Sequence, residues 1–204
     1  DSLAESPFTT YIFGFRNVTG LTDAQRQNQR SKAQHNAPFF WVDQETEFKV
    51  QLTNLGLGLR PDLTDAHTLH WHGFRNVIPF FDGEPTGSIS VPVNQLFTYV
   101  YRPHDPGTYM YHCHVEAVEH MQMGMLGNLY VRPAQNALAE GTVLGSVVHH
   151  AGNKYVYNDG DGSTFYDVEL PIQLGGMDSN YHEQHLGVQP LPFHLLHVDY
   201  AMLN

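Results

Sequence analysis

Residues 112–125 read HCHVEAVEHMQMGM and contain three histidines, one cysteine and three methionines. In a β-strand the side chains of residues i and i+2 point to the same side, so His112 and His114 aim their imidazoles at one place. Cys113, between them, faces the opposite side. We therefore expect one short strand to connect two separate metal sites through covalent bonds.

A second pair of the same kind lies earlier in the chain, where residues 67–73 read HTLHWHG. His70 and His72 face one side of a strand by the same alternation. His67 offers a further imidazole from a separate strand. Two His-x-His pairs, one of them with a cysteine inside it, are hard to obtain by chance, so we interpret these residues as metal ligands. The isolated histidines are interpreted as ordinary surface or core residues, and they are His35, His104, His149, His150, His182, His185, His194 and His197.

The donor types favour copper on the cysteine side. His120 and Met125 lie shortly after Cys113 and are able to turn back toward it. Two histidines, one cysteine and a weak axial methionine form the trigonal site of a blue copper centre. Zinc is the competing metal, but structural zinc sites usually contain close Cys-x-x-Cys pairs, and this chain has one cysteine. A Cys-His nucleophile is a third possibility, and it needs no His-x-His pair.

The overall composition excludes several classes of function. The 204 residues include 21 acidic and 10 basic side chains, a formal net charge of −11. Such a chain has no basic run to displace counterions from phosphates, so we expect no nucleic-acid partner. No apolar run approaches the roughly 20 residues that cross a bilayer, so we expect no membrane partner. The single cysteine excludes a disulfide within the chain.

The pattern of apolar residues predicts an all-β fold for the first part of the chain. Period-two alternation predicts a half-buried strand from Glu47 to Leu55. Further strands are predicted over 96–101, 107–112 and 126–131. A capping-box pattern predicts a surface helix from Thr22 to Ala33. Together these elements predict an antiparallel sandwich of about 130 residues that closes near Pro133.

The remaining residues predict a connection and a second, incomplete unit. Residues 134–164 are interpreted as a linker with a hairpin from Tyr155 to Tyr166, which turns at 158–162. The acidic turn lacks the glycine and the final acid of a calcium loop, so a plain hairpin turn is favoured. A strand is predicted from Tyr166 to Leu174, and residues 165–204 are expected to begin a second domain.

At its histidine and cysteine motifs the sequence resembles the multicopper oxidases, laccase-like proteins built from cupredoxin domains. The stretch 70–73, HWHG, is similar to the family's first copper motif. His112-Cys113-His114 with His120 and Met125 is similar to its last, although the family usually has a spacer two residues shorter before the following histidine. The resemblance implies a cupredoxin-type Greek-key β-sandwich over residues 1–133, with its blue copper in the first domain, as in two-domain multicopper oxidases.

The resemblance also implies a role for each ligand. The type 1 (blue) copper would be bound by His67, Cys113, His120 and Met125. The type 2 copper would be bound by His70, and the type 3 pair by His72, His112 and His114. Asp82 is placed like the family's acid that hydrogen-bonds cluster water and helps to deliver protons, so it is the candidate catalytic residue. From the residues alone it is equally well a turn-forming Asp-Gly.

The implied function is an oxidase that couples a small reducing substrate to dioxygen. Phenols, aromatic amines and low-valent metal ions are the possible donors, and dioxygen would be reduced to water. Four histidines are half of what a complete trinuclear cluster of this family uses, so a second cupredoxin domain or another subunit of a homo-oligomer is expected to supply the rest. The implied location is periplasmic or secreted.

Two alternatives remain open. The first is a copper nitrite reductase, which needs only one histidine beside the cysteine, so the presence of both His112 and His114 counts against it. The second is an electron-transfer module that binds copper but has no turnover of its own.

Overall fold

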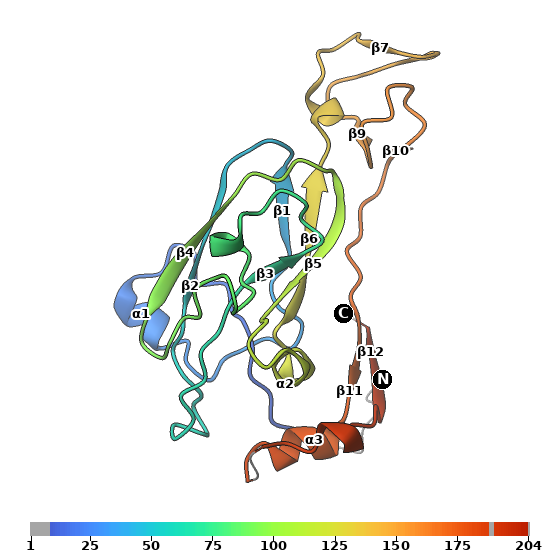
Figure 1. Cartoon of the computed structure of the whole chain (residues 1–204). Helices are drawn as coiled ribbons and strands as arrows, with labels where there is room; N and C mark the ends of the chain where they lie inside the picture. Colours follow the sequence, from blue (N-terminus) through green and yellow to red (C-terminus); the bar gives the residue numbers. More distant parts are fainter. Residues whose placement is uncertain (1–8, 188–189, 204) are drawn as a thin grey trace.

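The computed structural model describes residues 9–187 and 190–203. Figure 1 shows a β-sandwich built from the first two thirds of the chain, with the hairpins of the linker beyond one end and helix α3 beyond the other. The predicted linker and domain limits remain predictions. Within the described residues, no helix is long and apolar enough to span a membrane.

One layer of the sandwich is a four-stranded sheet in the order β1-β6-β5-β3. Its strands are β1 (Phe40–Asp43), β6 (Leu126–Arg132), β5 (Gly107–His112) and β3 (His70–His72). β5 pairs antiparallel with both of its neighbours, but β1 runs parallel to β6. The prediction of a purely antiparallel sandwich was therefore wrong at this edge of the sheet, where β1 and β6 run in the same direction.

The other layer is the antiparallel pair of β2 (Phe48–Thr53) and β4 (Leu96–Tyr101). The strands predicted over 96–101 and 107–112 are confirmed at both ends. The strand predicted from Glu47 to Leu55 is shorter in the structure, and the strand predicted over 126–131 extends to Arg132. Because successive side chains of a strand point to opposite faces, the apolar residues of the period-two patterns face the core.

The core between the layers is mainly aromatic. Trp71 is completely buried, and its ring lies 5.2 Å from that of Tyr101 and 4.9 Å from that of Tyr111, measured between centroids. The hydroxyl of Tyr101 donates to the backbone oxygen of Phe81 at 2.6 Å, next to the short 3₁₀ helix Pro79–Phe81. Burying an aromatic ring removes about 150–250 Å² from water, so these residues fix the positions of β3 and β5.

The two helices of the sandwich differ from expectation. α1 (Asp23–Gln27) begins with the predicted capping box, in which Thr22 Oγ1 accepts from Gln25 N–H at 3.3 Å, but it ends well before Ala33. It buries no residue, and a helix without a packed face lacks the tertiary contacts that stabilise a longer helix. α2 (Ala117–Met123) lies between His114 and Met125, where the sequence analysis predicts neither a helix nor a strand.

The linker contains the predicted hairpin. β9 (Lys154–Tyr155) pairs antiparallel with β10 (Phe165–Tyr166), after a first short hairpin of β7 (Val143–Leu144) and β8 (Val147–Val148) and a 3₁₀ helix at Ala134–Ala137. In the acidic turn the carboxylate of Asp159 accepts the N–H groups of Gly162 at 2.7 Å and Thr164 at 2.8 Å. The aspartate thus serves as the backbone-binding residue of a turn.

The strand predicted from Tyr166 to Leu174 was wrong. Val168, Leu170 and Ile172 alternate as expected but are exposed, because no strand in the described part of the chain pairs with this segment. The next strand, β11 (Leu174–Met177), pairs with β12 (Tyr200–Leu203), and between them lie α3 (Ser179–Gln184) and a 3₁₀ helix at Phe193–Leu195.

Candidate metal centres

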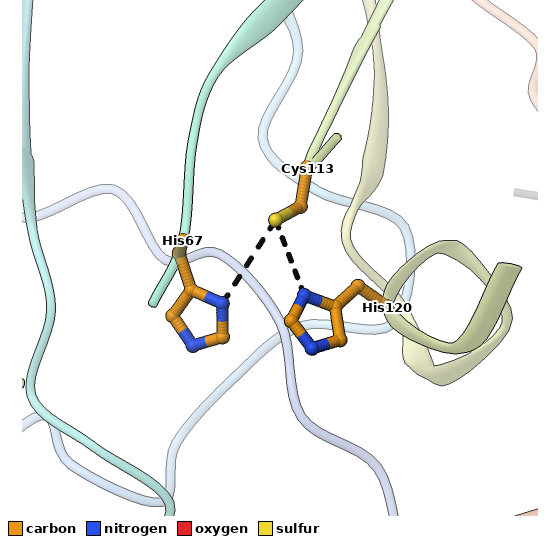
Figure 2. Close-up of side chains that lie close together, drawn as sticks. All are labelled: His67, Cys113 and His120. Atoms are coloured by element: carbon orange, nitrogen blue, oxygen red, sulfur yellow. Dashed lines mark hydrogen bonds between the residues drawn. The ribbon is translucent and has the colours of Figure 1, made fainter. Parts of the chain in front are cut away.

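The first candidate centre is the group of His67, Cys113 and His120. Cys113 follows the last residue of β5 and is completely buried. Its Sγ atom lies 3.2 Å from Nδ1 of His120 and 3.9 Å from Nδ1 of His67. Figure 2 shows both rings turning this nitrogen toward the sulfur. Sequence reasoning predicted all three residues as ligands of one metal, and the structure brings them together.

Backbone hydrogen bonds hold these three side chains in place. His67 exchanges two bonds with Val91, at 3.1 and 2.8 Å. The N–H of Thr68 donates to Cys113 Sγ at 3.4 Å, and the N–H of Cys113 donates to the backbone oxygen of Met125 at 3.2 Å. The ligand-bearing segments are therefore tied to one another before any metal binds, which reduces the ordering cost of binding.

Helix α2 is what returns His120 to the cysteine. Gly124 ends the helix at φ 127°, and its N–H donates to the backbone oxygen of Met121 at 3.2 Å. An added Cβ at this glycine would lie 3.0 Å from the backbone oxygen of Phe13, so only glycine fits without displacement. The helix explains how a spacer two residues longer than the family's usual one still delivers a histidine.

The charges at this centre suit metal binding. Burial alone would raise the pKa of the Cys113 thiol, but hydrogen bonds from His120 and His67 outweigh it and lower the pKa to about 5. The thiolate, which is the form that binds metals, is therefore present at neutral pH. Burial lowers the pKa of His120, but the carboxylate of Asp65 and the Cys113 thiolate outweigh it and raise the pKa to about 9.

The residues present fit copper. One thiolate and two imidazole nitrogens, all buried, form a soft and compact donor set. Met125 is also buried and, with His67, borders one cavity. Its role as axial ligand remains a prediction.

The second candidate centre lies at the same end of β5, on the side away from the Cys113 sulfur. It consists of His70, His72, His112 and His114. The strand register pairs His70 with His112, and the ring centroids of His70 and His114 are 4.9 Å apart. His72 Nδ1 lies 3.4 Å from His112 Nε2. Two nitrogens bound about 2.0 Å from one ion are roughly 3–4 Å apart, so this spacing fits a shared metal.

Hydrogen bonds set the tautomers of two of these rings. His70 Nδ1–H donates to the backbone oxygen of Asp82 at 2.7 Å, and His112 Nδ1–H donates to that of Cys113 at 2.9 Å; we assign both protons from these acceptors. In both rings Nε2 is left with its lone pair for a metal. Burial, and then repulsion from the neighbouring histidines, lowers the pKa of His112 to about 4, which keeps it neutral.

Asp82 lies where sequence reasoning placed it, beside the cluster. Its carboxylate is 3.3 Å from His70 Nδ1, and its side chain is partly exposed. It therefore lies beside the ring nitrogen that donates to the backbone oxygen of the same residue. The catalytic role itself remains a prediction.

The structure adds a group of residues that sequence reasoning missed. They surround the side of His120 that faces away from Cys113, and they are Asp65, Glu116, Glu119 and His185. Glu116 and His120 are four residues apart, a helical spacing, so prediction of α2 would have linked them. His185, which was interpreted as an ordinary residue, is brought there by α3, and no local pattern points to it.

The fold and the two donor sets define a copper-binding β-sandwich protein of the cupredoxin type. The family model described as multicopper oxidase matches residues 14–135, and the chain belongs to this family. Copper is accordingly its cofactor.

Curated relatives and solved structures agree with this family. Laccase-1 of Emericella nidulans is 29% identical over 117 residues, which cover 56% of this chain and 18% of that protein. Multicopper oxidase MCE of Talaromyces pinophilus is 35% identical over 78 residues, which cover 37% of this chain and 12% of that protein. The chain thus matches less than a fifth of the length of either relative.

Two solved structures share the fold. The blue copper oxidase from Nitrosomonas europaea superposes with a TM-score of 0.55 at 24% identity, and multicopper oxidase mgLAC with 0.53 at 20%. Both comparisons cover 82% of this chain and 43% of the other. They confirm the expected cupredoxin-type fold class.

Proposed function

We propose that the complete protein is an oxidase in which this chain receives electrons at Cys113 and delivers them to the histidine cluster. Copper bound at the two centres would supply one-electron oxidation of a reducing substrate and four-electron reduction of dioxygen to water. The type 1 site would use His67, Cys113 and His120, with Met125 as a weak axial donor. The family membership and the buried thiolate support this assignment.

The observation that carries the proposal is the direct bonding between the two donor sets. Cys113 belongs to one group of close donor atoms and its neighbour His112 to the other, while the ring of His114 lies 4.9 Å from that of His70. In addition, His112 Nδ1–H donates to the backbone oxygen of Cys113, which shortens the bonded route. An electron therefore has a path between the centres through consecutive bonded residues and this hydrogen bond.

The cluster side would share its metals with other residues. We assign His70 to a type 2 copper and His72, His112 and His114 to the type 3 pair. His72 is exposed, which leaves the cluster open on one side. We propose that a second cupredoxin domain, or another subunit of a homo-oligomer, closes this side with histidines of its own.

This proposal is tested by measuring the oxygen consumption and the copper content of two chains of different length. The chain of 204 residues is measured beside a longer chain that includes a whole second cupredoxin domain. We expect the blue site in both and rapid oxygen reduction in the longer chain. Equal oxygen reduction by a monomer of the shorter chain would contradict the shared cluster, and a blue site without oxygen reduction in either would favour an electron-transfer module.

A further inference from the structure

A cavity of about 360 Å³ lies beside the first metal centre, on the side of His67. Its walls come from the segment 10–18, from helix α1 with the turn after it, and from the segment 51–59. His67 and Met125 line it as well, whereas His120 does not. The cavity is therefore separate from the carboxylates that surround His120.

The inner wall of the cavity is mainly apolar. Five of its lining residues are both apolar and buried, and they are Phe13, Phe15, Leu52, Leu57 and Met125. The buried amide of Asn54 is already used, since it donates to the backbone oxygens of Asp65 at 2.8 Å and Val91 at 2.9 Å. Because one water takes about 30 Å³ of liquid, the cavity has the volume of roughly a dozen waters. Its inner end therefore suits one ring or a short alkyl chain.

Three arginines line the cavity, and they are Arg16, Arg26 and Arg30. Arg16 and Arg30 are exposed, so they form its outer part. Their guanidinium groups are held by the backbone, since Arg16 Nη1–H donates to the oxygen of Lys32 at 2.9 Å and Arg30 Nη2–H to that of Leu57 at 3.1 Å. A guanidinium has five N–H donors, so both arginines retain donors for a ligand.

The charge at the cavity is opposite to that of the chain as a whole. The chain has 21 acidic and 10 basic residues, yet none of the described residues that line the cavity is acidic. Arg26 is paired with Asp23 at 3.0 Å, but neither Arg16 nor Arg30 forms an ion pair within the described part of the chain. A local excess of positive charge of this kind attracts an anion.

We propose that this cavity binds a small amphipathic carboxylate. The carboxylate group is held by the guanidinium groups of Arg16 and Arg30, which suit its two oxygens, and the apolar part lies against the buried inner wall. An inorganic anion is disfavoured, because it uses the arginines and leaves the apolar wall uncovered. The two ends of the cavity thus select a molecule that has both parts.

A ligand at the inner end also reaches the metal centre. His67 and Met125 belong to the lining, so an apolar group there excludes water from the side of both residues. The polarity and solvent access around a metal site tune its properties. We therefore expect the blue band of the copper-loaded protein to respond to the ligand. This response rests on the proposed function, whereas binding of the carboxylate does not.

Binding is tested with 3-phenylpropionate, which carries no phenol and is not itself an electron donor. Titration calorimetry of the copper-loaded chain measures its affinity, and the uncharged 3-phenylpropionamide is the ligand control of matched shape. We expect one site per chain and binding of the amide that is weaker by about tenfold or more. Equal affinity for acid and amide, or no binding of the acid, would overturn the proposal.

The arginines are tested by Arg16→Gln and Arg30→Gln. Each variant is expected to weaken binding of 3-phenylpropionate by about tenfold and to leave that of the amide unchanged. Lys154→Gln is the matched control, because Lys154 is exposed and also forms no ion pair but lies in β9, outside the lining. An unchanged affinity in both arginine variants, or an equal loss in Lys154→Gln, would contradict the assigned contact.

The placement beside the metal centre is tested by following the blue band in the same titration. We expect a shift of the band that saturates with the midpoint found by calorimetry. Heat of binding without any change of the band would contradict the position of the apolar group beside His67 and Met125. If the band itself is absent, the proposed function fails, and calorimetry with the two ligands still decides whether the carboxylate site exists.

Discussion

The imidazole of His120 directs Nδ1 at the sulfur of Cys113 from 3.2 Å, and helix α2, which carries His120, brings the two residues together. The ligand loop is folded rather than extended, and its end is set by one glycine. The geometry of the proposed copper site therefore depends on the packing of this short helix.

Gly124→Ala tests that dependence. The alanine must adopt φ 127° and place Cβ 3.0 Å from the backbone oxygen of Phe13, so we expect a loss of about 1–3 kcal/mol in the free energy of unfolding and a shifted blue absorption band. Gly141→Ala is the control, since Gly141 also has positive φ but nothing lies within 4 Å of its Cβ position. Urea unfolding and the optical spectrum measure both. Identical spectra and stabilities for the two variants would contradict the role of Gly124.

Met125→Leu tests the axial position. A thioether is a weak axial donor, and its removal favours cuprous copper, so we expect a coloured site with a raised reduction potential. Voltammetry of the copper-loaded proteins measures the change, with Met110→Leu, at an exposed position of β5, as the control. If Met125→Leu keeps the original potential, the axial assignment is wrong and Met121 or Met123 becomes the next candidate.

Trp71→Ala tests the core that supports both centres. Trp71 lies between His70 and His72 with its ring completely buried, so truncation should cost about 3–5 kcal/mol in the free energy of unfolding. Trp41→Ala is the control, because Trp41 is half exposed and contacts the guanidinium of Arg132. Denaturant unfolding of the metal-free proteins compares them. A similar small cost at both tryptophans would show that β3 does not depend on Trp71.

The ligand groups were predictable because strand alternation is a local property. His70 and His72, like His112 and His114, need only two residues of extended chain to face the same way. Helix α2 also had a local signal that was not used, since residues 116–123 are rich in Glu, Ala, Gln and Met and are followed by Gly124.

Other features depend on packing that no local pattern contains. The alternating segment from Val168 to Ile172 resembles a half-buried strand, but a strand also needs a partner. His185 reaches Glu119 because α3 packs near α2, where His182 Nε2 contacts the backbone oxygen of Gln122 at 3.0 Å. Contacts between segments so distant in sequence follow from the fold and not from residue spacing.

We propose that Cys113 holds copper together with His67 and His120, and the optical spectrum of the copper-loaded chain shows whether it does. We expect an intense blue band from thiolate-to-copper charge transfer, and its loss in Cys113→Ser while the circular dichroism of the fold is retained, because a serine hydroxyl is neither soft nor ionised at neutral pH. A colourless copper-loaded protein, or a blue band that persists in Cys113→Ser, would contradict the claim.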